Sequence, residues 1–351
     1  MPFAVTTLPL SAATPRPSVV GHTGAHATSS PVGVAEGSPG FSSSTGGGGS
    51  ATAGTSSGGD AGSDPHPVAK ATVTPATRAN LRISVRVTMP NDPYDDPRLY
   101  DLEYRDQKDD IEYYVRLAKA NGGPILELGC GNGRITVPMA KAGVRVDGVD
   151  TSGPMLDALR DRLRGTRRSA RKLVRAYQMD FRNLKLDQTY PLVILPFNAL
   201  HHCPTHRDVL ALFAGVRRAM APGGLFVLDC YLPDPILYQR NPEDTYEHCT
   251  FIDPRKGGRL ESWERSWYDA LNQIHHVIYA YQRKGEPVEE VKLDLRVFYP
   301  QELVALLDLS GLRVLQAWSD FQGGRLTAAS LKAVLHLGLR DDADLTPPTL
   351  G

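Results

Sequence analysis

The chain has 351 residues, and its 39 Lys and Arg equal its 39 Asp and Glu, so the formal charge at neutral pH is zero. That balance argues against a protein that binds nucleic acid over its whole surface, because such binding depends on clustered cations. Apolar residues make up 41% of the chain, and none of their runs approaches the roughly 18 residues of a membrane helix. Four cysteines without CxxC spacing predict no disulfide scaffold and no metal site, and they fit a cytoplasmic protein.

The first part of the chain differs in composition from the rest. Residues 1 to about 80 consist mostly of Gly, Ser, Thr, Ala and Pro and lack Ile, Tyr and Trp. Such a segment cannot bury enough apolar surface to offset the backbone entropy lost on folding, so we predict that residues 1–85 are disordered and that a folded domain occupies residues 86–351. The pattern of a secretion signal is missing, since the first basic residue is Arg16. We therefore interpret the segment as a flexible linker or an over-extended start.

From about residue 93 the sequence alternates between helical and strand periods. The first helix has one apolar face, formed by Ile111 and its i+3, i+4 and i+7 neighbours, and we expect it to end near residues 121–123. Five short strands follow. We place them at residues 125–128, 144–150, a run ending at 177, 192–195 and 225–228. The intervening helices are expected at residues 135–142, 152–163 and 209–220.

Strands separated by helices of this length predict an α/β fold with a parallel sheet covered on both faces. This rhythm stops after about Tyr231. Strand-like stretches at residues 260–268 and 273–282 flank a polar turn, and Val291 begins an alternating strand with one wet face. We therefore predict an antiparallel β insertion over residues 240–299. A helix at residues 301–309 and strands at residues 312–317 and 331–339 complete the domain.

The chemical signal lies where the first strand meets its helix. Gly129, Gly131 and Gly133 form a GxGxG turn, which lets the backbone approach a ligand and point N–H groups at it. Asp150 ends the next strand, where a carboxylate can accept hydrogen bonds from ribose hydroxyls. This arrangement predicts a site for a cofactor that contains adenosine.

The spacing also indicates which cofactor. A dinucleotide site requires GxGxxG, but Arg134 stands where the third glycine should be. Glu127, two residues before the turn, places a carboxylate near the ligand, which is unfavourable for a pyrophosphate but suits a cationic amino group. S-adenosylmethionine is therefore favoured over NAD.

The segment Leu126-Glu127-Leu128-Gly129-Cys130-Gly131-Asn132-Gly133 resembles the class I S-adenosylmethionine-dependent methyltransferases. The resemblance extends over residues 100–235 and implies a Rossmann-like, seven-stranded, mostly parallel sheet with an inserted antiparallel β lid. It also implies that the 129–133 loop lies against the methionine part of the cofactor and that Asp150 binds the ribose. The remaining implied cofactor contacts are Asp180 and Phe181 at the adenine and Met155, which offers the purine an apolar face.

The residues before the first predicted strand narrow the resemblance. The stretch Leu99–Arg105 is similar to the amino-terminal part of small-molecule methyltransferases, especially the aminosugar N,N-dimethyltransferases. That likeness implies that Tyr104 closes over cofactor and acceptor with a catalytic role, and that Arg105 binds the cofactor's carboxylate. In the alternative interpretation, Tyr100 and Tyr104 only pack a helix on the sheet.

The fourth predicted strand leads into a loop, Pro196–His202, that should face the ligand because strand carboxyl ends line the crevice of such sheets. We expect Phe197 at the cofactor and His201 or His202 as a catalytic proton acceptor. Two other roles for the histidines remain open: a structural role, and metal binding together with Cys203 and His206. Metal binding is disfavoured because adjacent residues converge poorly on one ion.

These features predict an enzyme that transfers a methyl group from S-adenosylmethionine to nitrogen or oxygen of a small-molecule acceptor. Two alternatives remain. The chain could be an RNA or protein methyltransferase that uses the basic stretch Arg160–Arg175, or a silent cofactor-binding partner subunit. We expect no nucleic-acid or membrane partner and consider a homodimer possible.

Overall fold

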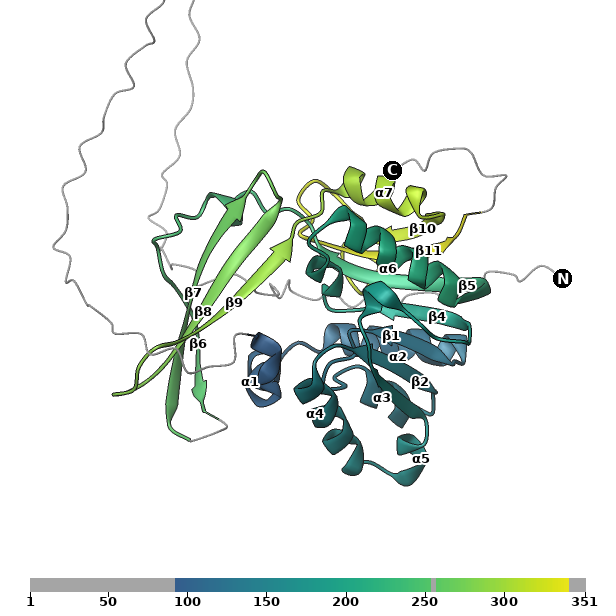
Figure 1. The fold of residues 1–351 in the computed structure, drawn as a ribbon, viewed down its shortest axis with the longest axis horizontal. Coiled ribbons are helices and arrows are strands. Elements are labelled where there is room, and N and C mark those ends of the chain that lie inside the picture. The colour runs from purple at the N-terminus through teal and green to yellow at the C-terminus, as the bar shows by residue number, and fades with distance from the viewer. Residues whose placement is uncertain (1–91, 254–256, 341–351) are drawn as a thin grey trace, which may run out of the picture. The chain divides into compact units, whose positions relative to one another are not determined.

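A computed structural model describes residues 92–253 and 257–340 (Figure 1), and residues 1–85 lie outside this range. Helices and short 3-10 helices occur in the order η1 (Pro93–Asp95), α1 (Pro97–Glu103), α2 (Asp109–Asn121), α3 (Thr136–Lys141), α4 (Gly153–Arg164), α5 (Arg168–Arg171), η2 (Phe181–Asn183), η3 (Ala199–His202), α6 (His206–Ala219), η4 (Leu237–Gln239) and α7 (Pro300–Leu309). Within the described ranges, none of these helices has the length and apolar character needed to cross a membrane.

The strands form two sheets. Their bounds are β1 (Ile125–Leu128), β2 (Val146–Asp150), β3 (Val174–Gln178), β4 (Tyr190–Leu195), β5 (Met220–Tyr231), β6 (Tyr246–Ile252), β7 (Arg259–Asp269), β8 (Ile274–Arg283), β9 (Glu289–Arg296), β10 (Leu312–Trp318) and β11 (Lys332–Leu339). The larger sheet has the order β10-β11-β5-β4-β1-β2-β3. Strands β1 to β5 pair in parallel, whereas β11 runs antiparallel to β5 and β10. The predicted Rossmann-like, mostly parallel sheet is therefore confirmed.

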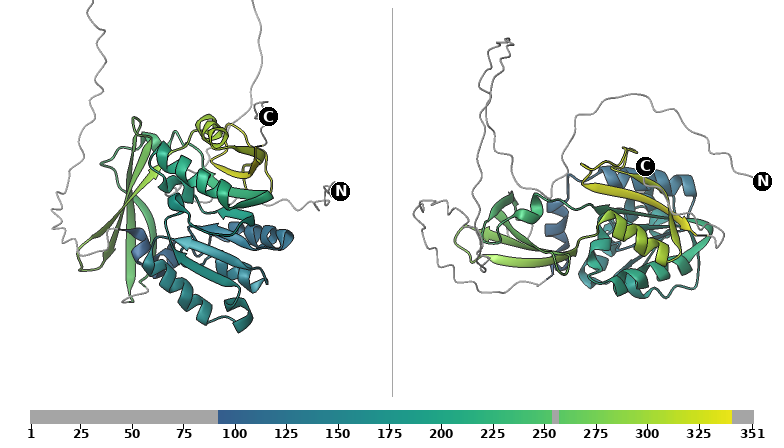
Figure 2. Two further views of the ribbon diagram at one scale, coloured as in Figure 1. Left: turned by 45° about the vertical axis from the view of Figure 1, so that its right-hand side comes forward. Right: turned by 90° about the horizontal axis from the view of Figure 1, so that it is seen from above.

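Both faces of the larger sheet are buried. Successive strand residues point to opposite faces, so Leu126 packs in the core that includes α6 and α7, while its neighbour Ile125 packs in the core that includes α2 and α3. Figure 2 shows α2 and α7 on opposite sides of the yellow strands when the fold is seen from above. Coverage of both faces explains the continuous apolar runs at residues 192–195 in β4 and 225–228 in β5.

Local signals explain where helices α4 and α6 begin. The hydroxyl of Ser152 accepts a hydrogen bond from the Met155 N–H at 3.2 Å, and this cap starts α4. Helix α6 starts with a capping box in which Thr205 and Asp208 each bond the other's backbone N–H. These caps fix where each helix leaves the carboxyl edge of the sheet.

The insertion forms a separate antiparallel sheet of order β6-β7-β8-β9. One face carries alternating buried residues such as Leu260, Val277 and Tyr279, which pack against Leu99 of α1. Strand β6 was not anticipated from the sequence. A register shift between Glu247 and Cys249 interrupts its pairing with β7, so strict alternation is missing there.

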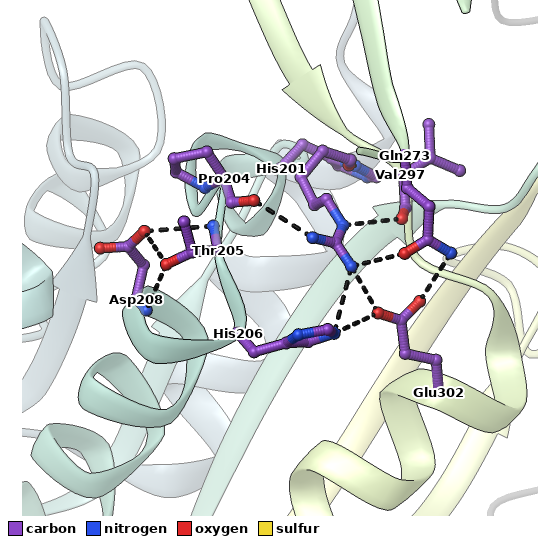
Figure 3. A network of polar contacts seen from close by, with 9 residues as sticks. His201, Pro204, Thr205, His206, Asp208, Gln273, Val297 and Glu302 are labelled. Carbon is purple, nitrogen blue, oxygen red and sulfur yellow. Dashed lines mark hydrogen bonds and ion pairs between the residues drawn. The ribbon is translucent and has the colours of Figure 1, made fainter. Parts of the chain in front are cut away.

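Arg296 fastens the end of β9 to the segment before α6 and to α7, and its partners Pro204 and Glu302 are labelled in Figure 3. The Arg296 side chain is buried and donates from Nη2 to Gln273 Oε1 and Glu302 Oε1, both at 2.6 Å. Its Nη1 donates to the Pro204 carbonyl at 3.1 Å. One guanidinium group therefore joins the insertion to the segment before α6 and to α7.

Candidate active site

The turn after β1 lies over the end of β2. The N–H groups of Gly129 and Cys130 donate to the Val149 carbonyl at 2.8 and 3.0 Å, and the Gly131 N–H donates to Asp150 Oδ2 at 2.7 Å. Gly129, Gly131 and Gly133 have φ angles of +70°, +50° and +82°. This left-handed backbone explains why glycine occupies all three positions.

Gly131 and Gly133 serve different purposes in the turn. A Cβ atom on Gly131 would meet no atom within 4 Å, so this position borders open space that a ligand can fill. A Cβ on Gly133 would lie 2.2 Å from Leu159 Cδ1, inside the contact between the turn and α4. Gly131 thus allows close approach of a ligand, while Gly133 allows helix packing.

Several predicted residues meet at a small cavity of about 30 Å³ beside this turn. Its lining comes from three segments: the turn itself, helix α1 and the loop after β4. The lining residues are Tyr100, Glu127, Gly129, Cys130, Gly131, Asn132, Arg134, Ile135, Pro196 and Phe197. Segments far apart in the sequence therefore converge where the parallel strands end.

Glu127 is a buried acid on the wall of this cavity. Its side chain accepts a hydrogen bond from Thr136 Oγ1 at 2.5 Å, and only 2% of the residue is exposed. Burial raises the pKa of Glu127 to about 8, although the Thr136 bond and the charge of Arg134 both act to lower it. A cationic ligand group would favour the ionised form of this carboxyl group.

Asp150 holds the turn and keeps capacity for a ligand. Its two oxygens accept from the Gly131 N–H at 2.7 Å and the Ser152 N–H at 2.8 Å. Burial raises the pKa of Asp150, against the lowering effect of these backbone bonds. Each carboxylate oxygen has a second lone pair, so the group can also accept from hydroxyls.

The predicted adenine contacts lie after β3 and at the start of α4. Asp180 caps η2, and Arg182 Nε donates to both of its oxygens at 2.9 and 3.0 Å. These bonds hold the pKa of Asp180 below its usual value. Phe181 approaches the turn, since its Cε1 would lie 3.9 Å from a Cβ on Gly129. Met155 is 1% exposed within the packed core.

Arg134, and not Arg105, is the cation at the glycine turn. The side chain of Arg105 is 61% exposed, pairs with Asp106 at 3.4 Å and lines a different cavity from Glu127. Arg134 places its guanidinium 4.1 Å from the centre of the Phe197 ring and donates to Asp110 Oδ1 at 2.9 Å. The sequence did mark Arg134, because this residue stands where a GxGxxG motif has its third glycine.

The loop after β4 has a strained backbone. Phe197 and Asn198 adopt φ angles of +56° and +61°, which are unfavourable for side chains with a Cβ. The buried Asp229 holds them, because its oxygens accept from the Phe197 N–H at 2.9 Å and the Asn198 N–H at 3.3 Å. Tyr114 donates a third bond to Asp229 at 2.7 Å. Sequence reasoning missed Asp229, since nothing local marks a buried anchor.

Five rings then form what we call the aromatic cluster: Tyr94, Tyr100, Tyr104, Phe197 and His202. The Tyr104 ring centre lies 4.7 Å from that of Tyr100 and 4.9 Å from that of Phe197. The Tyr94 hydroxyl lies 2.8 Å from His202 Nε2. The two ring-centre distances are typical of favourable edge-to-face and tilted aromatic pairs.

The two histidines of this loop have different surroundings. In His201, Nδ1 donates to the Arg296 carbonyl at 2.5 Å and Nε2 accepts from the Tyr231 N–H at 3.0 Å. Both ring nitrogens are therefore bonded to backbone groups. Contrary to expectation, His201 has no ring nitrogen left to accept a substrate proton, and it links the Arg296 and Tyr231 backbones. Burial lowers the pKa of His201 and His202 to about 4 each, so both rings are neutral at pH 7. Within residues 92–253 and 257–340, no three His, Cys, Asp or Glu side chains are grouped to hold a metal ion.

Comparisons with known proteins agree with this geometry. The model of a methyltransferase domain matches residues 125–224. Cypemycin N-terminal methyltransferase from a Streptomyces species is 36% identical over 120 residues, which cover 34% of this chain and 46% of that protein. The alignment thus spans less than half the length of that relative.

Solved structures share the fold over more of the chain. The CcbJ methyltransferase from Streptomyces caelestis has a TM-score of 0.57 and 28% identity and covers 66% of this chain and 95% of its own. An S-adenosylmethionine-dependent methyltransferase from Clostridium acetobutylicum has a TM-score of 0.56 and 15% identity, with 70% and 98% coverage, which supports the fold alone. The sheet order, the glycine turn with Asp150 and these likenesses show that the chain contains a match to a methyltransferase domain at residues 125–224 and is similar in fold to S-adenosylmethionine-dependent methyltransferases.

Proposed function

We propose that the protein transfers the methyl group of S-adenosylmethionine to a nitrogen of a small-molecule acceptor that binds beside the aromatic cluster. The observation that carries this proposal is the contact between the Tyr94 hydroxyl and His202 Nε2 at the carboxyl edge of the sheet. The match to an N-terminal methyltransferase supports nitrogen as the acceptor atom.

The residues in and around the glycine turn fit the cofactor. Gly131 leaves space for close approach, Asp150 has lone pairs for ribose hydroxyls, and Glu127 offers a carboxyl group to a cationic amine. Asp180 and Phe181 are the proposed adenine contacts. When bound, S-adenosylmethionine supplies a methyl group already activated on a sulfonium, so the protein contributes mainly position and exclusion of water.

The properties of His202 and Tyr94 favour nitrogen over oxygen. Burial lowers the pKa of His202 to about 4 and raises that of Tyr94 well above its usual value. The pair is therefore a weak base that accepts and donates hydrogen bonds in its neutral form. A neutral amine attacks through its own lone pair and needs no base in the transfer step. A hydroxyl acceptor would need a base with a pKa closer to 7.

Tyr104 has a positioning role in this proposal. Its ring packs against Phe197 and Tyr100, which lie on the loop after β4 and on α1. A ring held in this way can cover a ligand and orient an acceptor lone pair. Positioning of two reactants is the main rate contribution that a protein can make to such a transfer.

The test is a methyl-transfer assay with labelled S-adenosylmethionine against matched pairs of primary amines and alcohols, with an RNA pool as a third arm. We expect turnover of amines only. Tyr94→Phe should lower turnover by about 10- to 100-fold with unchanged S-adenosylhomocysteine affinity. Tyr104→Ala, which removes the ring, should lower turnover, whereas Tyr104→Phe, which keeps the ring, should retain it. Tyr299→Phe, at an exposed tyrosine, is the matched control. Methylation of alcohols or RNA alone would refute nitrogen as the acceptor atom, and binding without any turnover would indicate a silent subunit.

A further inference from the structure

A second cavity lies among helices α1, α2, α3 and α4. Its volume is about 400 Å³, which is within the range typical of small-molecule sites. Arg134 lines both this cavity and the one beside the glycine turn, and Tyr104 of the aromatic cluster borders it. The methyl transfer proposed above does not use this space, so its occupant is a separate question.

The lining of this cavity is strongly cationic. Among the described residues it contains one carboxylate, that of Asp101, against five cationic side chains: Arg105, Lys108, Arg134, Lys141 and Arg162. We therefore call it the cationic cavity. A cavity lined by charges of one sign concentrates counterions of the opposite sign, so this one favours an anionic ligand.

The three arginines already have carboxylate partners. Arg162 Nη2 donates to both oxygens of Asp101 at 2.5 Å. Arg134 Nη1 donates to Asp110 Oδ1 at 2.9 Å. Arg105 pairs with the exposed carboxylate that follows it in the sequence. Because these pairs neutralise the arginines, the excess positive charge of the cavity comes from its two lysines.

Lys108 and Lys141 have no partner of this kind. Within residues 92–253 and 257–340, neither ammonium group makes a hydrogen bond or an ion pair, and both residues are exposed. A phosphate monoester carries a charge of about −1.5 to −2 at pH 7 and therefore matches two ammonium groups. Lysine binds phosphate readily, as a compact point charge.

The rest of the lining is mostly apolar. Ile111 lies on α2, and Val137 and Pro138 lie on α3. Val137 is 3% exposed, and Tyr104 adds its ring to the lining. Small-molecule sites combine an apolar lining with a few charged groups, so we expect the ligand to carry an apolar body beside its anionic group.

We propose that the cationic cavity is a second ligand site, which binds a phosphate monoester with a small apolar body. Lys108 and Lys141 bind the phosphate group, and the apolar body packs against Ile111 and Val137. The site is separate from the glycine turn and does not depend on which atom of the acceptor is methylated. It goes beyond the proposed function and can be tested apart from it.

The test is calorimetric titration of the full chain with phenyl phosphate, with and without saturating S-adenosylhomocysteine. Inorganic phosphate and phenol are the comparison probes, and the ionic strength is held constant because salt screens exposed charges. We expect phenyl phosphate to bind at least about 10-fold tighter than inorganic phosphate, since burial of its ring adds to the ionic contacts. Phenol, which lacks the charge, should not bind, and S-adenosylhomocysteine should not displace phenyl phosphate.

The double variant Lys108→Gln with Lys141→Gln should weaken phenyl phosphate binding by at least about 10-fold, because hydrogen bonds to charged groups are lost. Lys119→Gln with Lys292→Gln is the matched control. It removes the same charge from two exposed lysines that line neither cavity, so it should keep the affinity. Equal melting temperatures of the two double variants would show that both fold.

Three results would overturn the site: equal affinities for phenyl phosphate and inorganic phosphate, unchanged phenyl phosphate binding in Lys108→Gln with Lys141→Gln, or displacement of phenyl phosphate by S-adenosylhomocysteine. Absence of saturable phenyl phosphate binding would do the same. Intact phenyl phosphate binding in a protein that methylates no amine would refute the proposed function alone.

Discussion

Alanine substitutions at two glycines of one turn should affect stability and cofactor binding differently. Gly131 and Gly133 both have left-handed backbones, so alanine at either position costs about 1–2 kcal/mol of stability. At Gly131 the new Cβ meets nothing, whereas at Gly133 it would overlap Leu159, which is fully buried and cannot move aside freely. Overpacking of a core typically adds about 1–3 kcal/mol.

The difference between the two variants follows from these terms. For a domain of this size, 1 kcal/mol shifts the melting temperature by roughly 2–4 °C. Gly133→Ala should therefore melt roughly 2–12 °C below Gly131→Ala. The loss of cofactor binding should follow the opposite order and be larger in Gly131→Ala. The reason is that the Cβ on Gly131 enters the open space beside the turn, while the Cβ on Gly133 faces α4.

The assay is thermal unfolding with and without S-adenosylhomocysteine at about 100 times its dissociation constant, where binding adds about 2.7 kcal/mol to the native state. We expect Gly131→Ala to lose most of the ligand-induced shift and Gly133→Ala to keep it. A full shift for Gly131→Ala would refute our placement of the cofactor against this turn, whatever the stability of the variant.

Three further outcomes are expected. Because burial raises the pKa of Glu127 to about 8, binding of a cationic cofactor should release a proton at pH 7, and Glu127→Gln should abolish the dependence of the calorimetric enthalpy on buffer ionisation. Because burial lowers the pKa of His201 to about 4, below the 6.5 of the unfolded chain, stability should fall as pH drops from about 6.5 to 4. His202 contributes in the same direction, so His201→Asn should make that fall shallower in melting curves without removing it, and an unchanged slope would contradict the prediction. Arg296→Met leaves Glu302 without its guanidinium and should cost about 3–5 kcal/mol in urea unfolding, with partial recovery in Arg296→Lys; equal stability of all three proteins would exclude Arg296 as an anchor.

Periodicity predicted the larger sheet because its signals are local. Strand β1 was expected at residues 125–128 and occurs at Ile125–Leu128, bounded by a cis Gly123–Pro124 bond and the glycine turn. Helix α7 was expected at residues 301–309 and occurs at Pro300–Leu309. The sequence did not predict α5 and β6, which are short elements with weak periodicity.

The site was predicted only where one segment carries the signal. The turn from Gly129 to Gly133 and Asp150 lie together as the motif indicated. The contact of Tyr94 with His202 joins residues 108 positions apart, and no local pattern pairs them. His201 was a candidate base by its place in the loop, and only the tertiary contacts of both ring nitrogens show that it is a link.

The fastening of the insertion has a consequence for protein engineering. The chain leaves the larger sheet after Tyr231 and returns through α7, which begins at Pro300, to β10 of that sheet, and His201 contacts backbone near both ends of the insertion, through Tyr231 and Arg296. The segment between them is therefore held at both ends near His201, and its buried face also packs against Leu99 of α1. Grafting a relative's insertion while keeping His201, Arg296, Glu302 and the residues that contact Leu99 should change acceptor choice and preserve the cofactor half of the enzyme.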